Sequence, residues 1–223
     1  MDEKFENICK FYSTIHKLKT LLRTGWLEWN VNADRFESVA EHIYGTQMLA
    51  FAVNSEFNLG LDIEKVVYML AFHEIGEAII GDVTPVDGVP REVKHEVERR
   101  AVQKVLETLE SGAEILKLFD EFEANQTKEA IFAEIIDHFE ANFQMKYYEE
   151  SGCTDINKAG IEAKELMKQK EFKDEKSLAN LWIKKYVKRE LSEESKDKAF
   201  TELAEFICTN SIFKNETNIE DLE

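Results

Sequence analysis

Residues that interrupt helices are scarce in this chain, and their scarcity restricts its fold more than any other feature. Only nine glycines and two prolines occur in 223 residues, against roughly 25 expected from average usage. Apolar residues recur at three- and four-residue spacing, the period of a helix packed on one face, for example at Ile63, Val66, Val67 and Leu70. Strand-like alternation is essentially absent. The sequence therefore predicts an all-α fold.

Start and stop signals divide the sequence into separate helices. Ser38, with Glu41 three residues later, is typical of a capping box and predicts a helix that reaches about residue 57. Asp62 caps the next predicted helix, which runs to residue 80 and ends at Gly81. Further helices are expected over 3–22, 90–110, 113–124, 127–150, 156–171, 177–189 and 193–212.

Charge and cysteine content exclude several classes of function. The formal net charge of −17 argues against a nucleic acid polymer as partner, because such a surface repels the phosphate backbone. A small anionic ligand is still allowed, since an arginine or a metal ion can reverse the potential inside one cleft. Cys9, Cys153 and Cys208 are widely spaced and indicate reduced thiols, and no apolar run has the length of a membrane span. We expect a soluble, cytoplasmic protein with no membrane partner.

One predicted helix places ionisable residues where its apolar stripe should enter the core. The stripe over 63–70 continues into His73, Glu74 and Glu77, and Asp82 follows shortly after. Burying such groups is costly unless they are paired, hydrogen-bonded or bound to a metal. The pattern therefore indicates a metal site inside a helical protein.

Two further residues have the donor types that would complete such a site. His42 lies on the preceding predicted helix, and Asp137 lies on a later one. Imidazole and carboxylate ligands suit a divalent ion such as Mn²⁺, Fe²⁺, Co²⁺ or Mg²⁺. Sequence spacing alone leaves open whether three helices converge on one point.

Several segments together resemble the HD-domain phosphohydrolases, in particular their 5′-deoxynucleotidase branch. The segments are Arg23-Thr-Gly-Trp26, Glu37-Ser-Val-Ala-Glu-His42, His73-Glu-Ile-Gly-Glu77-Ala-Ile-Ile-Gly-Asp82-Val-Thr-Pro85, Glu129 to Asp137, and Gln144 with Tyr148-Glu149. The resemblance covers about residues 10–150 and departs from the family at Glu74, where the family has aspartate. It implies an HD-domain helical bundle at 1–155. Residues 156–223 match no segment of the family, and we expect them to form additional C-terminal helices of unknown function packed on the same domain.

The resemblance also implies an activity and a set of site residues. The expected enzyme is a metal-dependent phosphohydrolase, a homodimer that removes phosphate from deoxyribonucleoside 5′-monophosphates. One divalent cation (Mn, Co, Fe, Mg or Zn) would be held by His42, His73, Glu74 and Asp137. Glu77, four residues after His73, would take a proton from the attacking water. The expected substrate contacts are Arg23 to the phosphate, and Trp26, Asp82 and Thr84 to the nucleoside or leaving group.

Other interpretations of these residues stay open at this stage. The chain could be an HD-family hydrolase of another nucleotide or phosphate ester, or a non-catalytic regulator that binds metal or nucleotide. Taken singly, His42 and Trp26 are typical of core residues, and Arg23 could instead interact with the carbonyl end of a helix. A zinc protease of the H-E-x-x-H type is disfavoured, because Glu77 stands where the second histidine belongs.

Overall fold

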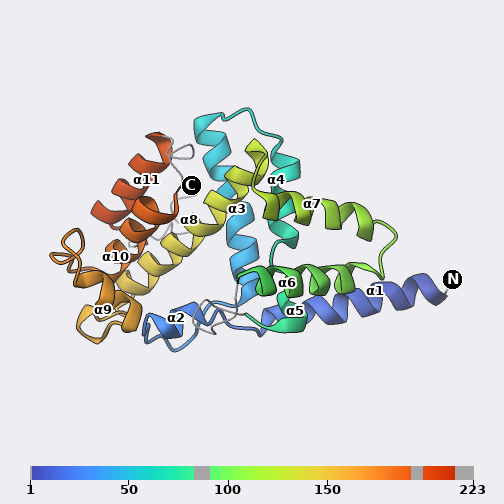
Figure 1. The fold of residues 1–223 in the computed structure, drawn as a ribbon, viewed down its shortest axis with the longest axis horizontal. Coiled ribbons are helices and arrows are strands. Elements are labelled where there is room, and N and C mark those ends of the chain that lie inside the picture. Colours follow the sequence, from blue (N-terminus) through green and yellow to red (C-terminus); the bar gives the residue numbers. More distant parts are fainter. Residues whose placement is uncertain (1, 83–90, 192–197, 214–223) are drawn as a thin grey trace, which may run out of the picture. The chain divides into compact units, whose positions relative to one another are not determined.

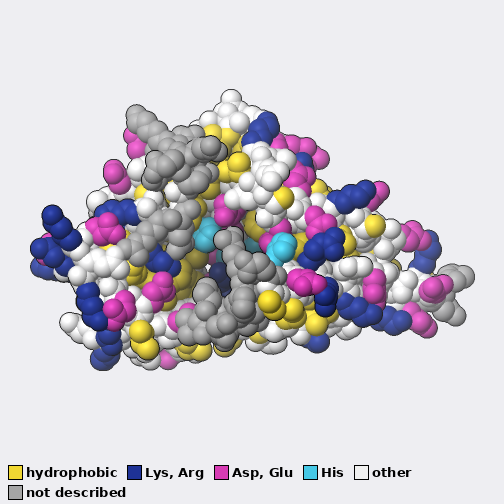
Figure 2. Space-filling model, in the orientation of Figure 1, with side chains coloured by type: hydrophobic (Ala, Val, Ile, Leu, Met, Phe, Trp, Pro, Cys, Tyr) yellow, Lys and Arg dark blue, Asp and Glu magenta, His cyan; other side chains and the backbone are white. Residues whose placement is uncertain are grey.

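The fold is helical throughout the part of the chain that can be described. The computed structural model describes residues 2–82, 91–191 and 198–213. Within these ranges the only β pairing is an isolated bridge between Leu22 and Ser38, which confirms the predicted all-α class. None of the helices in these ranges is long and apolar enough to cross a membrane. Acidic side chains recur across the face shown in Figure 2, with Lys and Arg between them, as expected from the net charge.

The chain forms two compact units. Unit 1 consists of Met1–Gly25 and Arg35–Glu140, and unit 2 consists of Trp26–Asp34 and Ala141–Glu223. The long helix α8, Lys128–Glu150, contributes its first half to unit 1 and its second half to unit 2. The domain boundary expected at residue 155 stays a prediction.

Unit 1 contains the helices that carry the conspicuous sequence motifs (Figure 1). They are α1 (Asp2–Ile15), η1 (His16–Lys19), α3 (Val39–Phe57), α4 (Ile63–Phe72), α5 (Glu77–Ile80), α6 (Arg91–Leu106), α7 (Gly112–Ala124) and the first half of α8. Helix α3 packs on α4, α4 on α7, and α7 on α6, which also contacts α1 and α5. A buried apolar cluster joins these elements and consists of Leu18, Val39, Ile75, Ala78, Val102, Val105, Leu106 and Phe119.

The predicted helix starts in unit 1 are confirmed by their hydrogen bonds. Ser38 accepts from the backbone N–H of Glu41 at 3.3 Å, and the Glu41 carboxylate accepts from the N–H of Ser38 at 2.9 Å, which completes the capping box. Asp62 accepts from the N–H of Lys65 at 3.1 Å at the start of α4. These caps satisfy backbone donors that a helix cannot satisfy internally. The sequence signals at Ser38 and Asp62 therefore correctly marked where two helices begin.

The helix predicted over 62–80 is interrupted by a turn, which corrects the sequence interpretation. Helix α4 ends at Phe72 and α5 begins at Glu77, and bonds from residue i to i+3 replace the regular ladder between them, as from Ile75 N–H to Phe72 O at 3.3 Å. Gly76 lets this turn lie against α6, because a Cβ there would lie 3.0 Å from Val102 Cγ2 of α6. The chain therefore packs closely on α6 at the point where His73 and Glu74 occur.

Unit 2 contains the remaining helices and an aromatic core. Its elements are α2 (Gly25–Glu28), the second half of α8, η3 (Ile156–Lys158), α9 (Ile161–Met167), α10 (Leu178–Lys185), η4 (Tyr186–Glu190) and α11 (Lys198–Thr209). Trp26 lies 5.4 Å from both Tyr148 and Trp182 between ring centroids, and Trp29 lies 4.5 Å from Trp182. Helix α10 also contacts α9, η4 and α11, so the C-terminal helices have a core of their own.

Candidate metal centre

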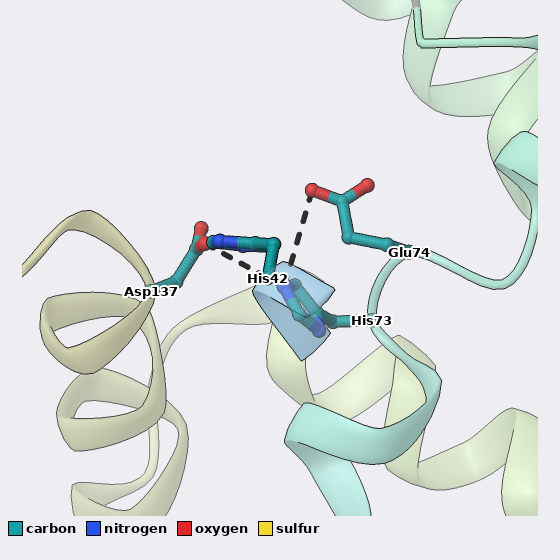
Figure 3. A group of neighbouring side chains, drawn as sticks. All are labelled: His42, His73, Glu74 and Asp137. Atoms are coloured by element: carbon teal, nitrogen blue, oxygen red, sulfur yellow. Dashed lines mark hydrogen bonds and ion pairs between the residues drawn. The ribbon is translucent and has the colours of Figure 1, made fainter. Parts of the chain in front are cut away.

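The structure brings together the four residues expected to bind a metal. His42 comes from α3, His73 and Glu74 from the turn after α4, and Asp137 from α8, and one donor atom of each lies within 4.8 Å of all the others. Their side chains point toward one another from three separate segments (Figure 3). Both imidazoles are buried, with His42 at 0% exposure. The convergence that spacing left open is therefore present in the fold.

Two consecutive residues of the turn at 73–76, His73 and Glu74, both reach the cluster. Neighbouring side chains on a regular α-helix diverge by about 100°. Here His73 Nε2 lies 3.9 Å from Glu74 Oε1 and 3.5 Å from Asp137 Oδ1. His42 Nε2 lies 2.7 Å from the same Asp137 oxygen. Asp137 is thus the common neighbour of both histidines.

The protonation of His73 indicates that the cluster fits a cation. Its Nδ1 lies 2.8 Å from the carbonyl oxygen of Leu70, and a carbonyl only accepts, so Nδ1 carries the hydrogen. Nε2 then presents a lone pair, is buried, and has no hydrogen-bond partner within the described ranges. Its neighbours are carboxylate oxygens of Glu74 and Asp137, which are acceptors as well. A divalent cation satisfies all of these lone pairs at once, and the N/O donor set suits it.

Electrostatics in the cluster favour a positive charge at the same point. Burial opposes ionisation of Asp137, but the hydrogen bond from His42 Nε2 holds the pKa of Asp137 well below its ordinary value. Burial and the charge of Arg23 oppose protonation of His42, yet its hydrogen bonds to Asp137 and Glu140 raise its pKa from 6.5 to about 10. A proton and a metal ion therefore compete for the same lone pair on His42 Nε2.

Glu77 lies beside this cluster and is buried, with 5% of its surface exposed. Burial and the charge of Glu74 raise the pKa of Glu77 to about 12, so its carboxyl group is protonated and hydrogen-bonds Glu74. Its Oε2 atom is buried and has no hydrogen-bond partner among the residues that the structure describes. The role expected for Glu77 in proton transfer stays a prediction, and the geometry supplies a free oxygen for it.

Arg23 brings a permanent positive charge to the edge of the acidic cluster. Its backbone N–H donates to Glu37 O at 3.0 Å, next to the bridge between Leu22 and Ser38. Its Nη1 lies 3.5 Å from Glu74 Oε1 and its Nε lies 4.0 Å from Glu37 Oε2. Burial opposes its charge, but the surrounding carboxylates raise the pKa of Arg23 above its ordinary value. The side chain is 20% exposed, so solvent can still reach it.

Asp82 is occupied by the loop that carries Arg23. Its Oδ2 accepts hydrogen bonds from the backbone N–H of Thr24 and, at 2.9 Å, from the Thr24 hydroxyl. Asp82 thereby fastens this loop to the end of α5. Thr84, the other expected contact in this segment, lies outside the described residues. Trp26 belongs to unit 2 and is buried at 2% exposure in the aromatic core, so the role expected for it beside a nucleoside stays a prediction.

Sequence reasoning missed two acidic residues at the back of the cluster. Glu140 Oε2 lies 2.5 Å from His42 Nδ1, and Glu37 lies within 4.8 Å of both of them through a carboxylate oxygen. Burial and the charge of Glu140 raise the pKa of Glu37 to about 8. The spacing held a signal for Glu140, because it follows Asp137 by three residues on the same helix face.

Comparison with known proteins places the chain in a family. The model of the HD domain matches residues 15–182. The chain belongs to the HD-domain family. Among curated relatives, this HD-domain protein is 35% identical over 150 residues to 5′-deoxynucleotidase HDDC2 of Dictyostelium discoideum, covering 64% of this chain and 78% of the relative.

A second curated relative agrees with this assignment, and a solved structure shares the fold. This HD-domain protein is 34% identical over 149 residues to 5′-deoxynucleotidase hdd1 of Schizosaccharomyces pombe, covering 64% of this chain and 73% of that protein. A solved structure of a conserved hypothetical protein from Pyrococcus furiosus superposes with a TM-score of 0.64 at 24% identity, covering 89% of this chain and 97% of that one, and this likeness concerns the fold alone. The resemblance of the sequence to the 5′-deoxynucleotidase branch is confirmed.

Proposed function

We propose that this HD-domain protein is a metal-dependent 5′-nucleotidase that removes phosphate from deoxyribonucleoside 5′-monophosphates. The observation that carries the proposal is the convergence of His42, His73, Glu74 and Asp137, whose donor atoms lie within 4.8 Å of one another. The similarity to proteins that carry the name 5′-deoxynucleotidase gives the reaction and the substrate class.

The four converging residues hold one divalent cation in this proposal. His73 contributes the unpartnered Nε2, and His42 contributes its Nε2 in place of the proton now shared with Asp137. When bound, the cation supplies Lewis acidity at the phosphoryl group and lowers the pKa of a bound water. Glu74 reaches the cluster despite being one methylene longer than the family's aspartate. Mn²⁺, Co²⁺, Fe²⁺, Mg²⁺ and Zn²⁺ are all compatible with this donor set.

Two other residues handle charge and protons in the reaction. Arg23 binds the substrate phosphate through its guanidinium, which the surrounding carboxylates keep fully charged. Glu77 accepts the proton of the attacking water at Oε2, the atom that lacks a partner. Once the charge of Glu74 is neutralised by a cation, one cause of the high pKa of Glu77 is removed, which favours the carboxylate form.

The substrate contacts follow from the loop that holds Arg23. Asp82 orients this loop through Thr24, and in this proposal its carboxylate, or Thr84 nearby in sequence, also bonds the sugar or leaving-group oxygen. Trp26 is assigned to the nucleoside side on the resemblance alone. In this proposal residues 1–155 form the catalytic domain, and residues 156–223 form a C-terminal helical extension of unknown function.

A homodimer in the cytoplasm is the expected state of the enzyme. Phe5, Ile8 and Tyr12 share one face of α1 and are each more than half exposed, which supports association with a second copy. All three cysteines are free thiols, in keeping with a reducing compartment. Sedimentation at micromolar concentration tests the dimer.

A phosphate-release screen tests the function. Purified protein is incubated with deoxyribo- and ribonucleoside monophosphates and simple phosphate esters, with Mn²⁺, Co²⁺ or Mg²⁺, beside metal analysis of the same sample. We expect turnover of the deoxyribonucleotides and its loss by at least about 100-fold in His73→Ala. His16→Ala, at an exposed histidine of η1, is the matched control and retains full activity.

The other outcomes of the screen contradict the proposal in different ways. Hydrolysis of other phosphate esters alone indicates an HD-family hydrolase of another substrate. Metal bound at one ion per chain with no turnover on any member of the panel indicates a non-catalytic regulator.

A further inference from the structure

His42 is held from both sides by carboxylates, and only one of them belongs to the expected metal ligands. Its ring is fully buried, with Nε2 at 2.7 Å from Asp137 Oδ1 and Nδ1 at 2.5 Å from Glu140 Oε2. A cation at the cluster would take the place of the proton on Nε2, and an imidazole that still donates from Nδ1 to a carboxylate presents its lone pair at Nε2. The contact with Glu140 therefore determines which nitrogen of His42 faces the cluster in Figure 3.

Glu140 is itself fixed by a second carboxyl group. It is 8% exposed on α8, and Glu37, at 6% exposure, forms a side-chain hydrogen bond with it. Glu37 is in turn placed by the backbone bond from Arg23 N–H to its carbonyl oxygen at 3.0 Å. Two buried carboxyl groups in contact are costly unless they share a proton in a hydrogen bond. Breaking this bond would restore that cost, so Glu140 has little freedom to turn away from His42.

Gly45 provides the space in which Glu140 approaches α3. It lies three residues after His42 inside this helix, where glycine is less favourable than alanine. A Cβ at this position would lie 2.6 Å from Glu140 Oε1 and 3.0 Å from its Cγ. The absence of a side chain at residue 45 is therefore required by the position of the Glu140 carboxylate.

We propose that Glu140 is a positioning residue that fixes the tautomer and orientation of His42 for metal binding, and that Glu37 and Gly45 hold Glu140 in place. The proposal rests on the metal-dependent function proposed above and extends it to three residues behind the ligands. Glu140 acts through His42 and touches neither substrate nor metal. Residues that hydrogen-bond a metal-binding histidine typically raise metal affinity by about 10- to 100-fold.

The central test is a metal titration of protein variants whose changed residues, Glu140 and the control Glu129, both lie on α8. Glu140→Gln and Glu140→Ala are titrated with Mn²⁺ and Zn²⁺ by calorimetry, and we expect affinities about 10- to 100-fold below wild type. Glu129→Gln is the matched control, because Glu129 lies on α8, is also 8% exposed, and accepts a hydrogen bond from Asp62 N–H at a distance from the cluster. It should bind metal as wild type does.

A double-mutant cycle separates positioning from a general effect on folding. Gly45→Ala should lower metal affinity in the wild-type background by about tenfold, because its Cβ displaces the Glu140 carboxylate. In the Glu140→Ala background the same change should have no further effect, since the displaced group is gone. Equal losses in both backgrounds would overturn the proposal.

Two further readouts make the test independent of turnover. In the Zn²⁺-loaded protein, ¹⁵N spectra of the histidine rings should show His42 protonated at Nδ1 in the wild type, with that signal altered in Glu140→Gln. Activity of Glu140→Gln should recover at high metal concentration, because affinity is what the change lowers. Wild-type affinity and an unchanged His42 spectrum in Glu140→Gln would refute the positioning role, whereas metal binding without phosphate release by the wild type would refute only the proposed function.

Discussion

Shortening Glu74 to aspartate is the most informative single change at the metal centre. Glu74 Oε1 lies 3.9 Å from His73 Nε2 and 3.5 Å from Arg23 Nη1. Removing one methylene withdraws the carboxylate by about 1.3 Å, whereas metal–ligand distances tolerate about 0.2 Å. The backbone has little room to follow, because even a Cβ at Gly76 would lie 3.0 Å from Val102 Cγ2 and 3.2 Å from the carbonyl oxygen of Glu98.

We therefore expect Glu74→Asp to weaken metal binding by about tenfold or more, although aspartate is the residue typical of the family. Calorimetric titration with Mn²⁺ measures the affinity, and phosphate release at saturating metal measures the remaining activity. Glu64→Asp, at an exposed position of α4, controls for the loss of a methylene from a helical glutamate. Glu74→Gln keeps the length and removes the charge. Wild-type affinity in Glu74→Asp would show that the turn moves, and the reasoning from Gly76 would be wrong.

Three further predictions concern metal, pH and the Arg23 loop. Removal of the metal with a chelator should lower the melting temperature by about 5–10 °C relative to protein in a 100-fold excess over Kd, and Asp137→Asn should abolish this difference in a thermal scan. Metal affinity measured by calorimetry should rise about tenfold per pH unit between pH 6.5 and 8.5, because the ion displaces a proton from His42, whose pKa is raised to about 10. In the metal-free protein, the stability that this proton contributes to the fold is complete below pH 6.5 and is lost as pH rises through about 10. A metal affinity that does not change with pH would contradict displacement of the His42 proton. Thr24→Val removes the hydroxyl bond to Asp82 and should raise KM about 2- to 10-fold with kcat little changed, whereas an unchanged KM in steady-state kinetics would show that this bond does not position Arg23.

The sequence predicted most of the fold because its signals are local. The capping box at Ser38 and the cap at Asp62 need only neighbouring residues, and the apolar spacing needs only one helix. His73 and Glu74 were identified because ionisable groups on an apolar stripe are chemically conspicuous. His42 and Asp137 were named for their donor types and through the family resemblance.

The rest depended on contacts between distant segments. The turn after Phe72 lies against α6 at Gly76, a contact between distant segments that no local pattern reveals. The hydrogen bond between His42 and Glu140 joins residues 98 positions apart, and Glu140 alone looks like any glutamate on a helix. Asp82 was expected to contact substrate, but the tertiary structure also engages it with Thr24.

The interrupted helix at 73–76 has a consequence for how occupancy of the site can be observed. The backbone hydrogen bonds from Ile75 N–H to Phe72 O and from Ala78 N–H to Ile75 O both measure 3.3 Å between N and O, beyond the usual N–H···O range of about 2.7–3.2 Å. Hydrogen bonds of this length are weaker than those of a regular helix, and hydrogen exchange at such amides reports local opening of the turn. A metal ion bound to His73 and Glu74 would slow deuterium uptake at the amides of Ile75 and Ala78. Hydrogen exchange at these two amides would therefore report whether the metal site is occupied, without any substrate.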